Sequence, residues 1–215
     1  MDLEQSRREY LAGGLRRKDL EADPIEQFRR WLEQAESAGV NDPTAMVLAT
    51  ASAAGEVSQR IVLLKHFDAQ GFVFYTNYES HKARDIAENP LVSLHFPWHA
   101  LDRQVKIRGR VSGVSREDSD KYFHNRPRES QIAATASDQS RKIENRASLL
   151  ARYEDIEQRY QGQRVPLPEF WGGYRVEAQR IEFWQGGAKR LHDRFLYRRV
   201  ASGNSDFWEI DRLAP

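Results

Sequence analysis

Short runs of β-branched and aromatic residues, separated by turns that contain glycine, constrain the fold of this chain more than any other feature. Three such runs follow one another over residues 45–51, 57–67 and 72–76, with turns at 53–55 and 68–71. The pattern is typical of antiparallel hairpins, because glycine allows a tight turn and branched side chains favour a pleated sheet. Further strands are predicted at residues 91–96 and 103–114, and three or four more at 171–210.

Helical patterns are inserted between these strands. Asp23, Pro24 and Glu26 supply an N-cap, a proline at the first helical position and an acid at the third, which predicts a helix to about residue 39. Other helices are predicted at residues 80–88, 115–124 and along the apolar stripe of residues 143–160. Together these elements predict an α+β fold whose sheet closes into a barrel. We expect residues 23–215 to form a single domain and the polar residues 1–22 to be a mobile arm outside the core.

Composition limits the functions that the chain can have. Of its 215 residues, 40% are hydrophobic and 30% charged, which suits one globular domain. It has no cysteine, which excludes disulfides, thiolate catalysis and cysteine-based zinc sites. The six histidines are scattered, so no metal site is expected. With no secretory signal and no apolar stretch near the roughly 20 residues of a membrane span, we expect a cytoplasmic protein that has no membrane partner.

The charges nearly balance, with 33 Lys and Arg against 32 Asp and Glu and a net charge of +1. A nucleic-acid partner is not expected, because such proteins normally carry a strong basic excess. Basic residues are concentrated locally, with ten basic and six acidic residues over 102–142. Local basic clusters in a neutral chain suit small anions better than a long polyanion.

The first candidate anion site lies where a predicted strand passes into a helix. Tyr75 and Thr76 end the strand, and His81 and Lys82 stand at the start of the helix. Free N–H groups and the helix dipole favour a phosphate at such a position, and Lys82 adds a positive charge. A capped helix on an ordinary surface has a similar pattern, so the segment alone leaves both interpretations open.

A second candidate site lies within nine residues. Tyr122, Arg126 and Ser130 combine an arginine fork with hydroxyl donors, which suits the three acceptor oxygens of a phosphate monoester. Arg60 and Lys65 stand at the two ends of an apolar strand, an odd number of positions apart, so their side chains face opposite sides of the strand. They are therefore placed to meet ligand groups rather than to form one charged stripe. A basic helix end and ordinary strand-end charges are the structural alternatives.

The segment 190–195 is dense in arginine, histidine and aspartate between aromatic strands. A Ser-His-Asp hydrolase is not supported, because the chain has no Gly-x-Ser-x-Gly elbow. The glycine motifs of dinucleotide-binding and P-loop proteins are also missing from the sequence. The residues by themselves therefore predict a β-rich protein that binds phosphorylated aromatic small molecules.

Motifs along nearly the whole chain carry a more specific signal. They are Arg60-Ile-Val-Leu-Leu-Lys65, Phe74-Tyr-Thr-Asn77, Phe96-Pro-Trp98, Tyr122-Phe-His-Asn-Arg-Pro-Arg128, Phe170-Trp-Gly-Gly173, Ile181-Glu-Phe-Trp-Gln-Gly-Gly187, Arg190-Leu-His-Asp-Arg-Phe195 and Ile210-Asp-Arg-Leu-Ala-Pro215. Each motif is weak alone. As a set they resemble the pyridoxine/pyridoxamine 5′-phosphate oxidase family.

The resemblance implies an FMN-binding split β-barrel with peripheral helices, in a homodimer that holds its flavins at the subunit interface. The implied cofactor-binding residues are Arg60, Ile61, Val62, Leu63, Leu64, Lys65, Tyr75, Thr76, His81, Lys82, Gln104, Trp184 and Arg194, with Gln139 and Ser140 reaching the flavin from the partner subunit. Arg60 and Lys82 are implied to lie near the FMN phosphate.

The resemblance also implies a substrate site. Lys65, Tyr122, Arg126 and Ser130 are implied to meet the substrate phosphate, Arg190 and His192 to lie over the pyridine ring as catalytic residues, and Arg7, Arg8, Glu9 and Tyr10 to fold over the site as a lid. The implied reaction oxidises pyridoxine or pyridoxamine 5′-phosphate to pyridoxal 5′-phosphate by hydride transfer from C4′ to flavin N5. Dioxygen then reoxidises the flavin and hydrogen peroxide is released, as is ammonia when the amine is the substrate.

Two positions depart from the family pattern. His81 stands where bacterial members often have arginine, and because histidine is largely neutral near pH 7.5, FMN binding is expected to be weaker or more dependent on pH. Ala134 and Thr135 replace a bulkier aromatic pattern, which bears on local packing.

Three other functions fit the sequence less well. A split-barrel flavin oxidase for another aromatic substrate, such as a phenazine precursor, is expected to lack the Arg7–Tyr10 arm and parts of the Tyr122–Ser130 cluster. A non-catalytic flavin or pyridoxal phosphate carrier leaves Arg190 and His192 without a purpose. An RNA-binding barrel predicts binding that depends steeply on salt, which the net charge does not favour.

Overall fold

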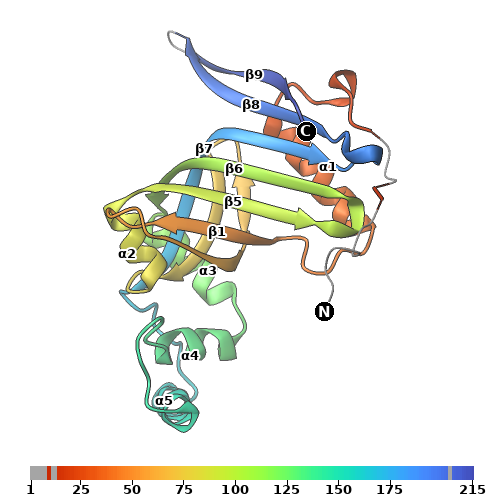
Figure 1. The fold of residues 1–215 in the computed structure, drawn as a ribbon. Coiled ribbons are helices and arrows are strands. Elements are labelled where there is room, and N and C mark those ends of the chain that lie inside the picture. The colour runs from red at the N-terminus through yellow and green to blue at the C-terminus, as the bar shows by residue number, and fades with distance from the viewer. Residues whose placement is uncertain (1–8, 11–13, 203–204) are drawn as a thin grey trace.

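The structure is a computed structural model that describes residues 9–10, 14–202 and 205–215 (Figure 1). Its strands are β1 (Ala45–Ala51), β2 (Val57–Leu63), β3 (His66–Asp68), β4 (Gly71–Asn77), β5 (Leu91–Trp98), β6 (Arg103–Gly113), β7 (Trp171–Gln185), β8 (Asp193–Ser202) and β9 (Ser205–Leu213). Its helices are α1 (Pro24–Ser37), α2 (His81–Glu88), α3 (Arg116–Asn125), α4 (Arg128–Ala136) and α5 (Arg146–Arg159), with short 3-10 turns at Arg17–Asp19, His99–Leu101 and Ala188–Arg190. The α+β class predicted from the sequence is confirmed.

All strands belong to one antiparallel sheet with the order β2-β1-β5-β6-β7-β4-β3. The long strand β7 pairs with β4 near its start, with β6 over most of its length and with β8 near its end, and β8 pairs with β9. The strands β2 and β3 stand at the two ends of this order. The sheet is therefore a split barrel, as the resemblance implied.

The predicted single strand of residues 57–67 is wrong, because it is divided at Leu64 and Lys65. The backbone N–H of Leu64 donates to the carbonyl of Thr44 beside β1, at 2.9 Å. The N–H of the next residue, Lys65, donates to the carbonyl of Val73 in β4, also at 2.9 Å. Two consecutive residues thus bond to different parts of the sheet, Leu64 beside β1 and Lys65 to β4, and the chain crosses from β2 to β3 between them.

The main core lies between α1 and the inner face of the sheet. Asp23 caps α1 by accepting a hydrogen bond from the N–H of Ile25 at 2.8 Å, and Pro24 occupies the first turn, as predicted. The ring of Phe28 lies 5.0 Å from the rings of both Phe72 and Phe96. Each fully buried aromatic side chain contributes about 1.5–3 kcal/mol through burial, so this contact fixes α1 on the sheet.

Residues 14–22 were expected to lie in an arm outside the core, and that expectation is wrong. Leu15 is 7% exposed and belongs to the main core. Its N–H donates to the carboxylate of Asp193 at 2.9 Å, and the hydroxyl of Tyr197 donates to the carbonyl of Glu21 at 2.7 Å. The charged residues around Leu15 hide this one apolar anchor in the sequence. Arg7 and Arg8 lie outside the described residues, so the lid stays a prediction.

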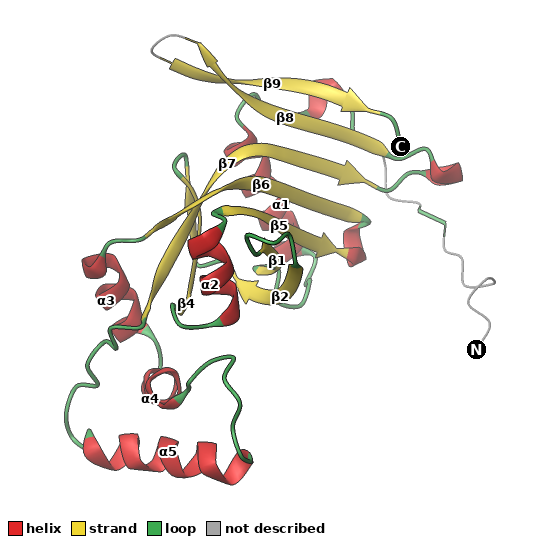
Figure 2. Cartoon of the chain, turned by 60° about the vertical axis from the view of Figure 1, so that its left-hand side comes forward, coloured by secondary structure: helices red, strands yellow, loops and turns green. Residues whose placement is uncertain are grey.

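The helices α4 and α5 stand away from the sheet, at the end of the molecule opposite β8 and β9 (Figures 1 and 2). α5 begins at Arg146, later than the predicted stripe, and it has no fully buried residue. Tyr153 and Ile156 pack partly against a second, small core formed by Phe123, Ile132, Val165 and Trp171. Among the described residues, no helix has the length and apolar character that crossing a membrane requires.

Candidate functional site

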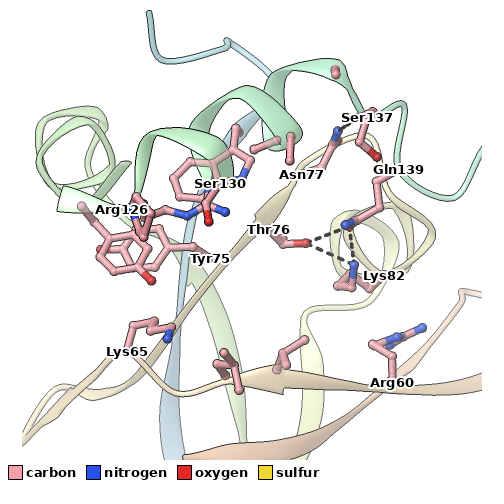
Figure 3. Close-up of a pocket in the computed structure, with 18 of the residues that line it drawn as sticks. Arg60, Lys65, Tyr75, Thr76, Asn77, Lys82, Arg126, Ser130, Ser137 and Gln139 are labelled. Atoms are coloured by element: carbon pink, nitrogen blue, oxygen red, sulfur yellow. Dashed lines mark hydrogen bonds between the residues drawn. The ribbon is translucent and has the colours of Figure 1, made fainter. Parts of the chain in front are cut away.

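One large cavity lies between the sheet and the helical segment of α3 to α5, with a volume of about 910 Å³. Of the site residues proposed from the sequence, it is lined by Arg60, Ile61, Val62, Leu63, Lys65, Tyr75, Thr76, Lys82, Tyr122, Arg126, Ser130 and Gln139. Figure 3 shows that its cationic side chains gather at two ends, with Arg126 and Lys65 at one and Lys82 and Arg60 at the other. The cavity is thus wide enough for two anionic groups with a ring system between them.

Lys82 marks the first end. Its side chain is buried, and Nζ donates to Thr76 Oγ1 at 3.1 Å, Ser80 Oγ at 3.2 Å and Gln139 Oε1 at 2.7 Å. Every one of these acceptors is uncharged. Burial, with a smaller contribution from the charge of Arg60, lowers the pKa of Lys82 to about 8. A buried ammonium group beside a second cation, with no carboxylate acceptor among the described residues, is suited to an anion.

Gln139 reaches this end from its own chain, where the resemblance implied a residue of the partner subunit. Besides Lys82, its Oε1 accepts a hydrogen bond from Thr76 Oγ1 at 3.2 Å. The segment before it is held by Asn77, whose amide donates to the carbonyl of Ser137 at 3.3 Å. The loop after α4 is therefore tied to the end of β4 within one chain.

Arg126 marks the second end. Its Nη1 is buried and has no hydrogen-bond acceptor among the described residues. The guanidinium carbon lies 4.9 Å from the centre of the Trp171 ring and 5.9 Å from that of Phe123, so the charge rests on aromatic faces. Burial lowers the pKa of Arg126, but an arginine stays protonated. The side chain is thus a desolvated cation with an unused donor.

Stacked aromatic rings form the wall beside Arg126. The rings of Tyr75 and Tyr122 stack at 3.9 Å with an interplanar angle of 16°, and those of Tyr75 and Trp171 lie 5.5 Å apart at 10°. The strand β7 can approach Tyr75 because it carries glycine there: a Cβ on Gly173 would lie 2.7 Å from the Tyr75 ring. The wall therefore depends on a β7 residue without a side chain.

Several proposed cofactor residues do not line this cavity. Leu64 faces the main core and is buried there. His81 points its Nε2 toward Asp85 Oδ1, at 3.7 Å, because the two residues lie one helical turn apart on α2. Ser140 is exposed, in the left-handed backbone region at φ 70°. These three stay predictions without support from the cavity.

A second group of proposed residues lies on the outer face of the sheet. Gln104 in β6 is directly opposite Trp184 in β7, which is opposite Arg194 in β8. Because adjacent strand residues face opposite sides and Val105, Phe183 and Phe195 are buried, this row points away from the core. Its members are held in place: Gln104 Oε1 lies 3.1 Å from His95 Nε2, and Arg194 Nε donates to Glu182 Oε1 at 2.9 Å.

Tyr10 and His192 join this outer group. The ring of Tyr10 lies 5.7 Å from that of Trp184 and 5.3 Å from that of His192, and the last two are 4.7 Å apart. A Cβ on Gly186 would lie 2.8 Å from the Tyr10 ring, so glycine allows this contact. The proposed lid residue Tyr10 and the proposed catalytic residue His192 are thus neighbours, while Glu9 is exposed.

Arg190 lies in the turn that leads to β8. Lys189 and Arg190 have φ values of 56° and 63°, a conformation that costs a non-glycine residue of order 1–2 kcal/mol. Strained backbone of this kind concentrates at functional sites. In a single chain most of the proposed residues therefore fall into two groups, one in the cavity and one on the outer sheet face and the turn before β8, while Leu64, His81 and Ser140 belong to neither.

The sequence interpretation missed several residues that line the cavity. They are Asn77, Pro127, Ala133, Ala134, Ala136, Ser137, Leu149, Leu150, Tyr153 and Trp171. Trp171 was visible only as part of a motif at the start of a strand, and nothing in the strand pattern shows that its ring supports an arginine. The residues of α4 and α5 line the cavity through tertiary packing, which leaves no local signal.

Comparisons with known proteins show the family to which this sequence is similar. A family profile described as "Pyridoxamine 5'-phosphate oxidase" matches residues 32–160, and one described as "Pyridoxine 5'-phosphate oxidase C-terminal dimerisation region" matches residues 171–215. The pyridoxine/pyridoxamine 5′-phosphate oxidase of Teredinibacter turnerae is 59% identical over 215 residues, which covers 100% of both chains.

Solved structures share the fold. PhzG from Burkholderia lata, crystallised with tetrahydrophenazine-1-carboxylic acid, has a TM-score of 0.85 and 31% identity over 92% of this chain and 95% of its own. A pyridoxamine 5′-phosphate oxidase-related, FMN-binding protein from Nostoc punctiforme has a TM-score of 0.71 over 91% of this chain and 100% of its own. At 13% identity, the second similarity concerns the fold alone.

Proposed function

This chain belongs to the pyridoxamine 5′-phosphate oxidase family, and from that membership we propose that it is an FMN-dependent enzyme that oxidises pyridoxine 5′-phosphate or pyridoxamine 5′-phosphate to pyridoxal 5′-phosphate. The observation that carries the proposal is a cavity with a cation at each end that has no carboxylate partner among the described residues: Lys82 is buried, and Arg126 is half-buried with a buried Nη1. Lys82 has only uncharged acceptors, and Nη1 of Arg126 has none among the described residues. A phosphorylated cofactor and a phosphorylated substrate, bound together, supply one anion for each.

The first end fits the phosphate of FMN. Lys82 and Arg60 supply two positive charges there, and Thr76 and Gln139 fix the position of Nζ. We assign the wall formed by Ile61, Val62 and Leu63 to the apolar part of the cofactor. FMN, when bound, supplies the two-electron acceptor, and dioxygen is the oxidant that regenerates it with release of hydrogen peroxide.

The second end fits the phosphate of the substrate. Arg126 donates through its buried Nη1, while Tyr122, Ser130 and Lys65 bring hydroxyl and ammonium donors to the same part of the cavity. Desolvation strengthens each of these contacts, because water does not compete for the anion. These residues therefore bind and orient the substrate, and they select for its 5′-phosphate.

We further propose that the site is completed by a second copy of the chain. Arg190 and His192, the proposed catalytic residues, do not line the cavity of their own chain: His192 lies beside Trp184 on the outer face, and Arg190 lies in the turn before β8. The cavity wall is itself open to solvent in one chain, with Ile61 71% and Leu63 43% exposed. A homodimer that buries it would bring the outer group of one subunit to the cavity of the other. The match of residues 171–215 to a dimerisation region supports this arrangement.

Two measurements test the proposed function. The purified protein should be yellow, and it should release one hydrogen peroxide for each pyridoxal 5′-phosphate formed from pyridoxine 5′-phosphate. A phenazine-type oxidase would not need the 5′-phosphate, so equal turnover of phosphorylated and unphosphorylated substrate would reject the assigned substrate. Colourless protein that stays inactive with added FMN would reject the cofactor.

A further inference from the structure

The proposed function leaves one buried acid beside the cavity without a role. Asp85 lies on α2, is 4% exposed, and turns its side chain toward β1 and β2. Its Oδ2 accepts hydrogen bonds from Thr50 Oγ1 at 2.5 Å and Ser58 Oγ at 3.1 Å. A carboxylate is costly to bury, and one placed next to an anion site opposes the charge of the ligand. The burial of the Asp85 carboxylate at this position therefore needs an explanation.

The two hydroxyl groups connect Asp85 to Arg60. Nη1 of Arg60 donates to Thr50 Oγ1 at 2.7 Å, Nη2 donates to Ser58 Oγ, and Nη2 also lies 3.9 Å from Asp85 Oδ2. An ionised carboxylate can only accept hydrogen bonds, so both hydroxyl hydrogens are drawn toward Asp85. Their oxygens are then left to accept from the guanidinium group. Asp85 thus sets the direction of the two side-chain hydrogen bonds that hold Arg60, while Nη1 also donates to the carbonyl of Leu48 at 3.4 Å.

These contacts occupy only one end of the guanidinium group. Nε of Arg60 donates to none of the described residues, and the side chain lines the cavity at the same end as Lys82. Burial lowers the pKa of Arg60, and the negative charge of Asp85 opposes that shift. The carboxylate therefore supports the cation in two ways, by orientation and by charge.

We propose that Asp85 is a positioning residue of the cofactor site, which acts through Thr50 and Ser58 to hold Arg60 in the orientation that meets the phosphate of FMN. The inference rests on the FMN site proposed above. Asp85 itself has no contact with the cavity lining except through Arg60 and those hydroxyl groups. The other titratable group that faces it is His81, whose Nε2 lies 3.7 Å from Oδ1 on the same helix.

Charge and orientation predict opposite results for Asp85→Asn. If Asp85 acted only as a negative charge near a phosphate, its removal would tighten FMN binding. If it positions Arg60, the amide can donate to Thr50 and Ser58, the hydroxyl groups turn, and each oxygen has one lone pair fewer to offer Arg60. We expect the second effect to dominate, because the hydrogen bonds are direct whereas the phosphate is separated from Asp85 by the arginine.

The test compares Kd values for FMN and riboflavin, measured by quenching of flavin fluorescence in the full-length protein after removal of bound flavin. Riboflavin lacks only the phosphate. Asp85→Asn should raise the Kd for FMN about tenfold, equivalent to about 1.4 kcal/mol, and leave that for riboflavin unchanged. Thr50→Val and Ser58→Ala, which keep the carboxylate, should act in the same direction and carry the test if Asp85→Asn fails to fold.

Asp68→Asn is the matched control, because Asp68 accepts a hydrogen bond from Arg175 and lies outside the cavity lining. It should leave both Kd values unchanged. An unchanged or lower Kd for FMN in Asp85→Asn, or an equal loss for riboflavin, would overturn the positioning role. Wild-type protein that binds FMN no more tightly than riboflavin would instead overturn the proposed phosphate site itself.

Discussion

Nζ of Lys82 at the start of α2 lies 2.7 Å from Oε1 of Gln139, 57 residues further along the chain. This hydrogen bond joins the loop after α4 to the start of α2, and the ammonium group lines the cavity. Because the acceptor is an amide and not a carboxylate, the positive charge of Lys82 is oriented without being neutralised. Burial and the nearby charge of Arg60 lower the pKa of Lys82, and the uncharged acceptor leaves its positive charge available to an anion.

FMN binding should weaken as the pH rises through 8. Lys82 has a pKa of about 8 in the protein without ligand, so its positive charge is present at pH 7 and is lost above that value. If only the protonated form binds the phosphate, the Kd for FMN should rise about tenfold between pH 7 and pH 9. Titrations at several pH values measure this, and Lys82→Arg, which stays charged, should flatten the profile. A flat profile in the wild type would contradict the role of Lys82.

Replacing Lys82 by methionine should stabilise the protein in the absence of flavin. The pKa of Lys82 falls from 10.5 to about 8 on folding, so between these values the unfolded chain binds more protons and wild-type stability rises with pH. Below pH 8 Lys82 is protonated in both states, and the burial of its charge lowers the free energy of unfolding by the full amount. Lys82→Met should raise Tm at pH 7 by about 2–4 °C and abolish tight FMN binding, as measured by calorimetry. A lower Tm would show that the site needs the cation for folding.

Arg126→Ala should raise KM for pyridoxine 5′-phosphate by about 10–100-fold, the range expected for loss of hydrogen bonds to a charged group. The preference over unphosphorylated pyridoxine should fall by the same factor, while the Kd for FMN stays unchanged. Arg128→Ala is the control, because Arg128 donates to the carbonyls of Gln163 and Tyr160 and does not line the cavity. If Arg126→Ala keeps the full preference for the phosphorylated substrate, Arg126 does not bind the substrate phosphate.

Mixed dimers should reveal whether the site is shared between subunits. Arg126→Ala and Arg190→Ala each disable a different group of residues. In a dimer that contains one chain of each kind, a shared site places both defects in one active site and leaves the other intact. At a substrate concentration well below the KM of Arg126→Ala, where both parent variants are impaired, random mixing should then restore about a quarter of wild-type activity. No recovery from mixed dimers would mean that Arg126 and Arg190 act within one chain.

The positions of most strands along the chain and the start of α1 could be predicted from the sequence, because those signals are local. Asp23 and Pro24 announce a helix start, and β1 has the bounds expected from its run of apolar residues. The division at Leu64 could not be predicted, since it arises from two adjacent backbone groups that bond to strands far apart in sequence. The burial of Leu15 was hidden for the same reason.

The two ends of the cavity that are proposed to bind anions could be seen in the sequence as clusters of basic residues. The residues that support those basic side chains could not. Arg126 stood out by composition, but its orphaned donor and its contact with Trp171 exist only after α3 packs on β7. Gln139 could be named through resemblance, and its bond to Lys82 within one chain could not. Sequence therefore indicated which residues carry charge, and packing decides which of those charges remain unpaired.

The central claim is that a coenzyme and a phosphorylated pyridine occupy the two ends of one site, close enough for electrons to pass between them. An anaerobic titration tests it most directly: pyridoxine 5′-phosphate is added to the yellow protein and the flavin absorbance near 450 nm, about the usual position for an oxidised flavin, is followed. The account predicts bleaching with one equivalent of substrate and recovery of the colour on admission of air. Flavin that stays oxidised with saturating substrate would contradict it.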